Sequence, residues 1–196
     1  MLKFTRCHLV VRVMPLHGRQ TKRLRRGRIS LPGARYFVTC CTQNRVPILI
    51  SSDDGSRLLD VFRDLHEVGD ALFCAATVMP DHLHLLFTLG KRLRFAQVLG
   101  KLKSLARAHG HVSWRWQENA FERQLRADEL FEDFGLYIYM NPYRAGLCSM
   151  CERWPLWFCP DPHQLRFMSM LKPDGTPPME WLAEAERIEA RLKTRD

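Results

Sequence analysis

The chain has 196 residues, of which 46% are hydrophobic and 26% are charged. These proportions exclude an intrinsically disordered chain and fit one globular domain with basic extensions. No apolar run approaches the ~18 residues that a membrane span needs. A short apolar patch near the N-terminus is broken by Arg12 and Pro15, unlike the core of a secretory signal. We therefore expect a cytoplasmic protein.

The charge balance points to a polyanionic partner. Thirty Lys and Arg residues against 21 Asp and Glu give a net charge of +9 and a pI near 9.5. Basic residues at phosphates release counterions and so supply affinity for nucleic acid, although a merely basic surface has the same composition. A DNA partner would place the protein in the nucleoid.

The cysteine pattern favours a reducing compartment, because the seven cysteines are an odd number and two of them are adjacent. Four residues near the C-terminus are of types that bind zinc: Cys148, Cys151, Cys159 and His163. They do not form two close pairs, and the tryptophan and phenylalanine residues between them favour packing over a metal site.

The first half of the chain alternates strands and a helix after a basic start. Residues 1–28 are unusually basic, and we interpret them as an arm that contacts phosphates or as a solvated tail. Residues 35–42 are rich in β-branched and aromatic side chains, which predicts a strand. Apolar residues at helical spacing predict a helix that begins near Asp53. Two further strands, at 71–79 and 82–89, are predicted to form a hairpin.

The second half begins with a basic amphipathic helix, predicted over 95–109. Short extended pieces follow at 114–117 and 121–125. A helix is then predicted over 128–140. We expect it to stop there, because Pro142 removes a backbone donor and its ring clashes with the preceding turn.

The order of these elements predicts an α+β fold. Strand, helix, strand, strand, helix, strand, helix is the order of a ferredoxin-like sandwich, a central antiparallel sheet with helices on one side. We divide the chain into a basic arm at 1–28, a core domain at 29–160 and a C-terminal extension at 161–196. The extension carries a charged helix over 178–193.

Two histidines begin the third predicted strand. Side chains alternate along a strand, so His82 and His84 project from one side while Leu83 points into the opposite layer. Two imidazoles at this spacing can bind one divalent metal, and the turn before them opens the site to solvent. The pattern alone is weak, because surface and core histidines show the same spacing.

A tyrosine and an asparagine share one face of the predicted helix over 128–140. Tyr137 and Asn141 are four residues apart, so Tyr137 would lie over a metal bound by the Asn141 amide oxygen. A phenol has a pKa of about 10, so as a nucleophile it needs a metal that polarises the scissile phosphate. Without the histidine pair, packing would be the simpler role for Tyr137, as it is for Tyr139.

Two blocks of sequence carry a family resemblance. They are MPDHLHLL at 79–86 and YIYMNPYRAGL at 137–147. With shorter matches between them, these blocks resemble the HUH single-tyrosine transposases, and in particular the branch of REP-associated tyrosine transposases. The resemblance covers roughly residues 28–160.

The resemblance implies a ferredoxin-like nuclease that binds single-stranded DNA, often beside a hairpin. Tyr137 matches the nucleophile, which attacks a phosphodiester, keeps a 5′-phosphotyrosine link and frees a 3′-OH. His82, His84 and Asn141 match the metal ligands, and the family's metal is Mg²⁺ or Mn²⁺. Relatives of this branch resemble monomers, and a homodimer with a swapped helix stays open. A departure is Gly135, which costs the nucleophile's helix roughly 1 kcal/mol of helix propensity.

Nine basic and aromatic side chains are predicted to line the DNA-binding surface: Lys101, Lys103, Arg107, Trp114, Arg115, Trp116, Arg123, Arg126 and Arg144. The basic side chains would contact phosphates. The tryptophans would stack on unpaired bases, each stack contributing ~1–3 kcal/mol. Core packing is the alternative role for both tryptophans.

Two other functions would use many of the same features. A sequence-specific hairpin-binding protein with lost or vestigial nuclease activity would share the fold, but it has no chemical need for the His-Leu-His and Tyr-Asn pairs. An RNA-binding ferredoxin-like module would carry aromatic residues on its two central strands, whereas one of these strands carries histidines here. We therefore expect a metal-dependent DNA strand transferase.

Overall fold

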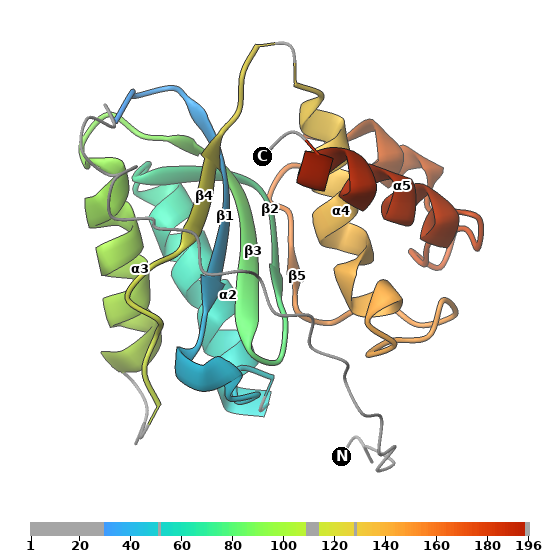
Figure 1. Cartoon of the computed structure of the whole chain (residues 1–196), viewed down its shortest axis with the longest axis horizontal. Helices are drawn as coiled ribbons and strands as arrows, with labels where there is room; N and C mark the ends of the chain where they lie inside the picture. Colours follow the sequence, from blue (N-terminus) through green and yellow to red (C-terminus); the bar gives the residue numbers. More distant parts are fainter. Residues whose placement is uncertain (1–29, 51, 109–113, 128, 195–196) are drawn as a thin grey trace.

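The computed structural model describes residues 30–50, 52–108, 114–127 and 129–194 (Figure 1). The predicted arm at 1–28 lies outside these residues. Within them, five strands form an antiparallel sheet in the order β4-β1-β3-β2-β5. The strands are β1 (Arg35–Cys41), β2 (Ala71–Val78), β3 (His82–Leu89), β4 (Phe121–Gln124) and β5 (Trp157–Phe158). The helices are α2 (Ser52–Glu67), α3 (Phe95–Ala108), α4 (Phe131–Arg144), α5 (Trp181–Thr194) and three short 3-10 turns, η1 (Gln43–Arg45), η2 (Pro162–Gln164) and η3 (Arg166–Met170).

The order β1-α2-β2-β3-α3-β4 confirms the ferredoxin-like prediction. Strands β1 and β3 lie side by side within the sheet, and their near-continuous apolar sequences suit strands that are covered on both faces. The predicted hairpin is formed by β2 and β3, which pair from Ala71 and Leu89 to Val78 and Leu83. On the other side of β3, Thr39 of β1 pairs with His84.

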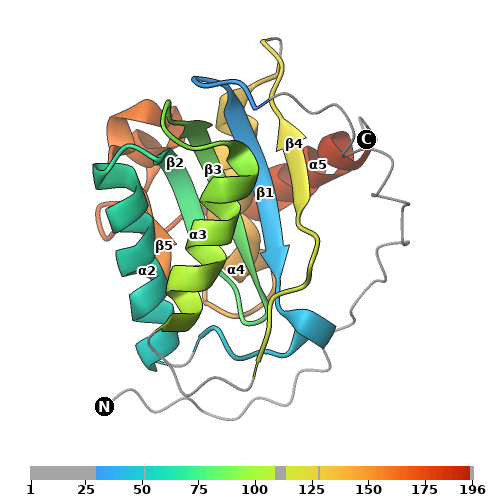
Figure 2. The same cartoon turned by 90° about the vertical axis from the view of Figure 1, so that its left-hand side faces the viewer.

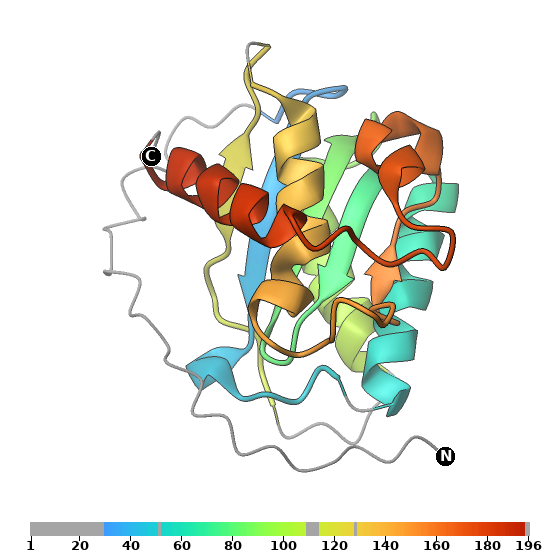
Figure 3. The ribbon, with the colours of Figure 1, turned by 90° about the vertical axis from the view of Figure 1, so that its right-hand side faces the viewer.

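Two layers of helices cover the sheet. Helices α2 and α3 pack on one face around a core that includes Phe62, Phe73 and Leu102 (Figure 2). Helices α4 and α5 cover the opposite face around a second core, which includes Phe37 and Phe134 (Figure 3). The expectation of helices on one side therefore holds for α2 and α3, while α4 and α5 add a layer because the second face of the sheet is also apolar.

Helix α4 continues past the point where the sequence predicted its end. It runs to Arg144 with Pro142 inside its last turn. Proline there removes the hydrogen bond to the residue four positions earlier. However, the Ala145 N–H closes the turn by donating to the carbonyl of Asn141 at 3.0 Å. The helix therefore carries Arg144, two turns after Tyr137, on its last turn.

The C-terminal segment joins the second core. Leu165, Phe167 and Trp181 are buried there beside residues of α4, and α5 lies across that helix (Figure 3). Among the described residues, no helix combines the length and the apolar character that crossing a membrane requires.

Candidate active site

The two histidines of β3 converge on one point. The Nε2 atoms of His82 and His84 lie 3.1 Å apart, on the sheet face that α4 covers. Leu83 is buried in the opposite core, as the strand alternation predicted. Metal–imidazole bonds are about 2.1 Å long, so two nitrogens at this separation can bind the same ion.

The other ring nitrogen of each histidine is bonded to a neighbouring side chain. Nδ1 of His82 lies 2.6 Å from a carboxylate oxygen of Asp81, and Nδ1 of His84 lies 2.9 Å from the hydroxyl of Thr39. Such partners fix the tautomer and the ring orientation of metal-binding histidines. An ionised carboxylate can only accept a hydrogen bond, so Nδ1 of His82 is the donor in its contact with Asp81.

The electrostatics of the site favour the neutral form of His84 and the ionised form of Asp81. Burial lowers the pKa of His84 well below 6.5, and the nearby charges of His82, Arg45 and Arg144 lower it further. Burial alone would raise the pKa of Asp81, but its hydrogen bond and charge interaction with His82 and the charge of Arg45 bring it below 3.8. A neutral imidazole beside an ionised carboxylate is the state that binds a cation.

Helix α4 places Tyr137 beside this pair. The ring centroids of Tyr137 and His84 lie 5.5 Å apart, with the planes at 73°. Phe37 of β1 contacts both rings, at 5.8 Å from His84 and 5.9 Å from Tyr137. The structure therefore brings the predicted nucleophile and the two predicted histidine ligands to one face of the sheet.

Asn141 stands one helical turn after Tyr137, as predicted. Its amide nitrogen donates to the backbone carbonyl of Tyr137 at 2.7 Å. Because the nitrogen is used in this way, the group that Asn141 offers to a ligand is its Oδ1 atom. An amide oxygen together with two imidazoles is a donor set that accepts a divalent cation.

A family profile matches the region that holds the histidines. The profile, described as IS200-like transposase, matches residues 30–126. The chain belongs to the IS200-like transposase family. The matched range includes both site histidines and ends before Tyr137, so the geometry above is what associates the tyrosine with them.

Two solved structures are similar to this chain, and the first agrees with this assignment at the level of the fold. One is a REP-associated tyrosine transposase bound to a REP hairpin, with 22% identity over 66% of this chain and 79% of that chain and a TM-score of 0.57. Another is a proposed transposase from Deinococcus radiodurans, with 20% identity over 52% of this chain and 85% of that chain and a TM-score of 0.42. No curated protein matches the chain.

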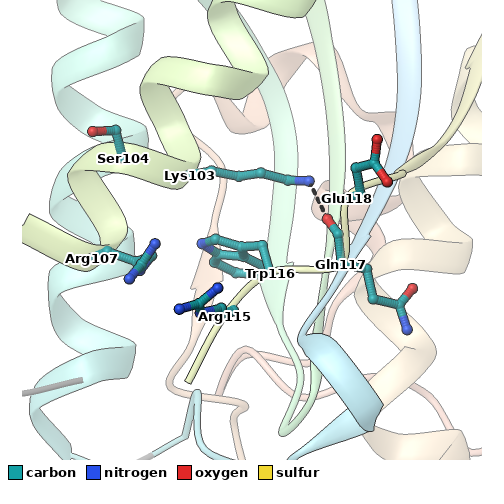
Figure 4. Close-up of a pocket in the computed structure, with 7 residues that line it drawn as sticks. All are labelled: Lys103, Ser104, Arg107, Arg115, Trp116, Gln117 and Glu118. Atoms are coloured by element: carbon teal, nitrogen blue, oxygen red, sulfur yellow. Dashed lines mark hydrogen bonds between the residues drawn. The ribbon is translucent and has the colours of Figure 1, made fainter. Parts of the chain in front are cut away.

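Some of the predicted DNA-binding residues of the transposase gather around an open pocket. The pocket has a volume of about 560 Å³. Lys103, Arg107 and Arg115 line it, and Lys103 donates to the backbone carbonyl of Gln117 at 2.8 Å (Figure 4). It lies between α3 and the segment that precedes β4. Arg126 is also exposed, near the end of β4.

Other predicted DNA-binding residues form ion pairs within the protein. Lys101 pairs with Asp70, a carboxylate that is only 1% exposed, at 2.7 Å. Arg123 pairs with Glu129 at 2.5 Å and is itself largely buried. Arg144 of α4 pairs with an acidic residue of α5. The pairs of Lys101 and Arg144 join segments that are distant in the chain, which the sequence order does not reveal.

The two tryptophans take the alternative role that the sequence left open. Trp114 and Trp116 are 6% and 9% exposed, belong to the first core and meet edge to face with ring centroids 4.8 Å apart. Packing therefore covers most of both rings, although Trp116 also lines the pocket between α3 and the segment that precedes β4 (Figure 4). Base stacking by either tryptophan stays a prediction.

Sequence reasoning missed three residues of the site. Asp81, Thr39 and Arg45 hold or neighbour the histidines, with Arg45 pairing to Asp81 at 3.2 Å. The position of Asp81 directly before His82 was a usable signal, because a carboxylate next to a metal-binding histidine often orients it. Thr39 reaches His84 only through the pairing of β1 with β3.

The cysteines near the C-terminus lie at the edge of the second core. Cys148 and Cys159 pack against it, and Cys151 is exposed. Among the described residues, no three His, Cys, Asp or Glu side chains gather as a metal site.

Proposed function

We propose that this transposase cleaves and rejoins single-stranded DNA beside a hairpin, with Tyr137 as the nucleophile. The observation that carries the proposal is the convergence of the His82 and His84 Nε2 atoms at 3.1 Å, with the Tyr137 ring 5.5 Å from that of His84. A tyrosine that only packs has no need of two histidines whose Nε2 atoms face each other.

The proposed reaction exchanges one phosphate ester for another. The phenolic oxygen of Tyr137 forms a bond to phosphorus, and the bond between phosphorus and the 3′ oxygen of the preceding nucleotide breaks. The phenol releases its proton to water, and the departing oxygen takes one up as a 3′-OH. The 5′ end stays linked as a phosphotyrosine, and attack by a 3′-OH reverses the step and rejoins the strand.

The residues of the site fit a divalent metal. His82, His84 and the Oδ1 atom of Asn141 would hold Mg²⁺ or Mn²⁺. When bound, the ion supplies positive charge that polarises the scissile phosphate. Asp81 and Thr39 keep the imidazole rings turned toward that position through their contacts at 2.6 and 2.9 Å.

The proposed substrate follows from charge and from the family. A net charge of +9 favours DNA, and the pocket lined by Lys103, Arg107 and Arg115 offers phosphates a cationic surface. One solved structure of the same fold is a transposase bound to a REP hairpin. We therefore propose hairpin DNA with a single-stranded flank as the substrate.

The test is a covalent-adduct assay with a labelled hairpin oligonucleotide. Wild-type protein with Mg²⁺ or Mn²⁺ is expected to give a protein–DNA adduct that is lost with chelator and in Tyr137→Phe. Tyr139→Phe is the matched control and should retain the adduct, because Tyr139 is buried and donates to the backbone carbonyl of Gly175. Tight hairpin binding without an adduct would instead identify a binding protein with lost nuclease activity.

A further inference from the structure

Arg144 lies against the ring of the proposed nucleophile. It ends α4 seven residues after Tyr137, which is two helical turns, so the two side chains share a face. The Cζ atom of Arg144 is 5.5 Å from the centroid of the Tyr137 ring. This separation is within the ~6 Å over which a cation attracts an aromatic face. The Tyr137 ring therefore contacts both Arg144 and His84.

The partner that holds Arg144 in place comes from the C-terminal helix. Glu189 of α5 accepts a hydrogen bond from Nη2 of Arg144 and forms an ion pair with it. The two side chains are only 16% and 26% exposed. Screening by water is weaker for such a pair than for a surface pair, so the carboxylate restrains the planar guanidinium more firmly.

Helix α5 is itself anchored on α4. Trp181 and Ala185 are buried in the second core. Arg191 of α5 pairs with Asp133 of α4 at 3.1 Å, which is a second ion pair between the same two helices. The position of Glu189 is therefore fixed by the packing of α5 on α4.

We propose that Arg144 is a positioning residue for Tyr137 and that Glu189 holds it over the ring, so that α5 sets the orientation of the nucleophile. This inference rests on the proposed role of Tyr137. A guanidinium held between a carboxylate and the ring limits rotation of the phenol. Attack on phosphorus requires that orientation, because misplaced reacting atoms lose rate rather than affinity.

The test separates the rate of adduct formation from DNA affinity. Glu189→Gln keeps the size of the side chain and removes its charge. At saturating hairpin DNA with Mn²⁺, its single-turnover rate is expected to fall about tenfold, with the Kd changed less than about twofold. Arg144→Gln should slow the reaction similarly, and combining the two changes should add little, because contacting residues act as one unit.

Arg191→Gln is the matched control, since it removes the other ion pair between α5 and α4. It should lower the melting temperature no more than Glu189→Gln, because Arg191 is the more exposed residue, and leave the rate unchanged. An equal loss of rate in Arg191→Gln would show that α5 only supports the fold. A weaker Kd with an unchanged rate in Glu189→Gln would make Arg144 a DNA contact. Either result would overturn the inference.

A second readout needs no catalysis. The chain has 4 tyrosines, so ring signals of ¹³C-tyrosine-labelled full-length protein can be assigned with Tyr137→Phe. Glu189→Gln is expected to shift the Tyr137 ring signal, and Arg191→Gln is expected to leave it in place. An unshifted signal in Glu189→Gln overturns the inference even if the adduct forms, whereas a wild-type protein without adduct overturns the proposed function.

Discussion

At the scale of residues, the site is defined by what each imidazole nitrogen contacts. Each Nδ1 atom is bonded to a neighbour, Asp81 or Thr39, and the two Nε2 atoms face each other at 3.1 Å. Two imidazoles in this arrangement could bind one cation, and the Asp81 carboxylate would increase the electron-donating power of His82. The hydrogen bond and charge interaction with His82, and then the contact with Arg45, lower the pKa of that carboxylate.

The role of Asp81 gives the first prediction. Asp81→Ala removes the acceptor that orients His82, and the affinity of the protein for Mn²⁺ is expected to fall by about tenfold or more. Calorimetric titration of the full-length protein measures this directly. Asp60→Ala is the control, because Asp60 is an exposed residue of α2 that pairs with Arg63. Equal Mn²⁺ affinity in the two variants would show that Asp81 does not support the site.

At the scale of elements, two helical glycines have opposite surroundings. A Cβ atom on Gly100 of α3 would meet no atom within 4 Å, whereas one on Gly135 of α4 would lie 2.7 Å from Cδ2 of Leu165 and 3.3 Å from Cε1 of Phe167. Gly135 therefore allows the C-terminal segment to approach the helix that carries Tyr137. Glycine has a low helix propensity, and the close packing of Leu165 and Phe167 offsets that cost at this position.

These surroundings predict opposite effects of the same substitution. Gly100→Ala is expected to raise the free energy of unfolding by about 0.5–1 kcal/mol, because alanine loses less backbone entropy in a helix. In Gly135→Ala the added methyl group would crowd Leu165, which offsets the gain in helix stability. Its melting temperature is therefore expected to be no higher than that of the wild type. Thermal unfolding followed by circular dichroism compares them. A similar rise in melting temperature for both variants would contradict the packing explanation.

At the scale of the whole molecule, the face of the sheet that carries the histidines is closed by the C-terminal part of the chain. Leu165, Phe167 and Trp181 are almost fully buried against α4 and the sheet. The segment at 161–194, which follows the proposed boundary at residue 160, therefore contributes to the same core as α4, the helix of the proposed nucleophile.

Truncation after residue 160 tests this dependence. Removing three large buried side chains costs ~2–5 kcal/mol each, which together approaches the ~5–15 kcal/mol of a whole domain. The truncated chain is expected to lose cooperative unfolding in urea. Deletion of the arm at 1–28 should keep that transition and weaken the salt dependence of hairpin binding. A truncated chain with the wild-type midpoint would show that the segment is dispensable for folding.

Local periodicity by itself determined the arrangement of the chemistry within each element. The two-residue repeat of a strand places His82 and His84 on one face and Leu83 on the other. The helical repeat places Tyr137 and Asn141 on one face of α4. The order of strands and helices likewise predicted the ferredoxin-like sheet, because these signals depend only on neighbours in the chain.

Only the tertiary structure decided which side chains contact one another. Which tryptophans are buried, which carboxylate holds Arg144 and which hydroxyl meets His84 depend on strand register and on helices that dock from distant segments. A basic residue has the same appearance in the sequence whether it contacts DNA or an internal acid such as Asp70 or Glu189. The difference is a matter of distance and burial, and only the folded chain sets both.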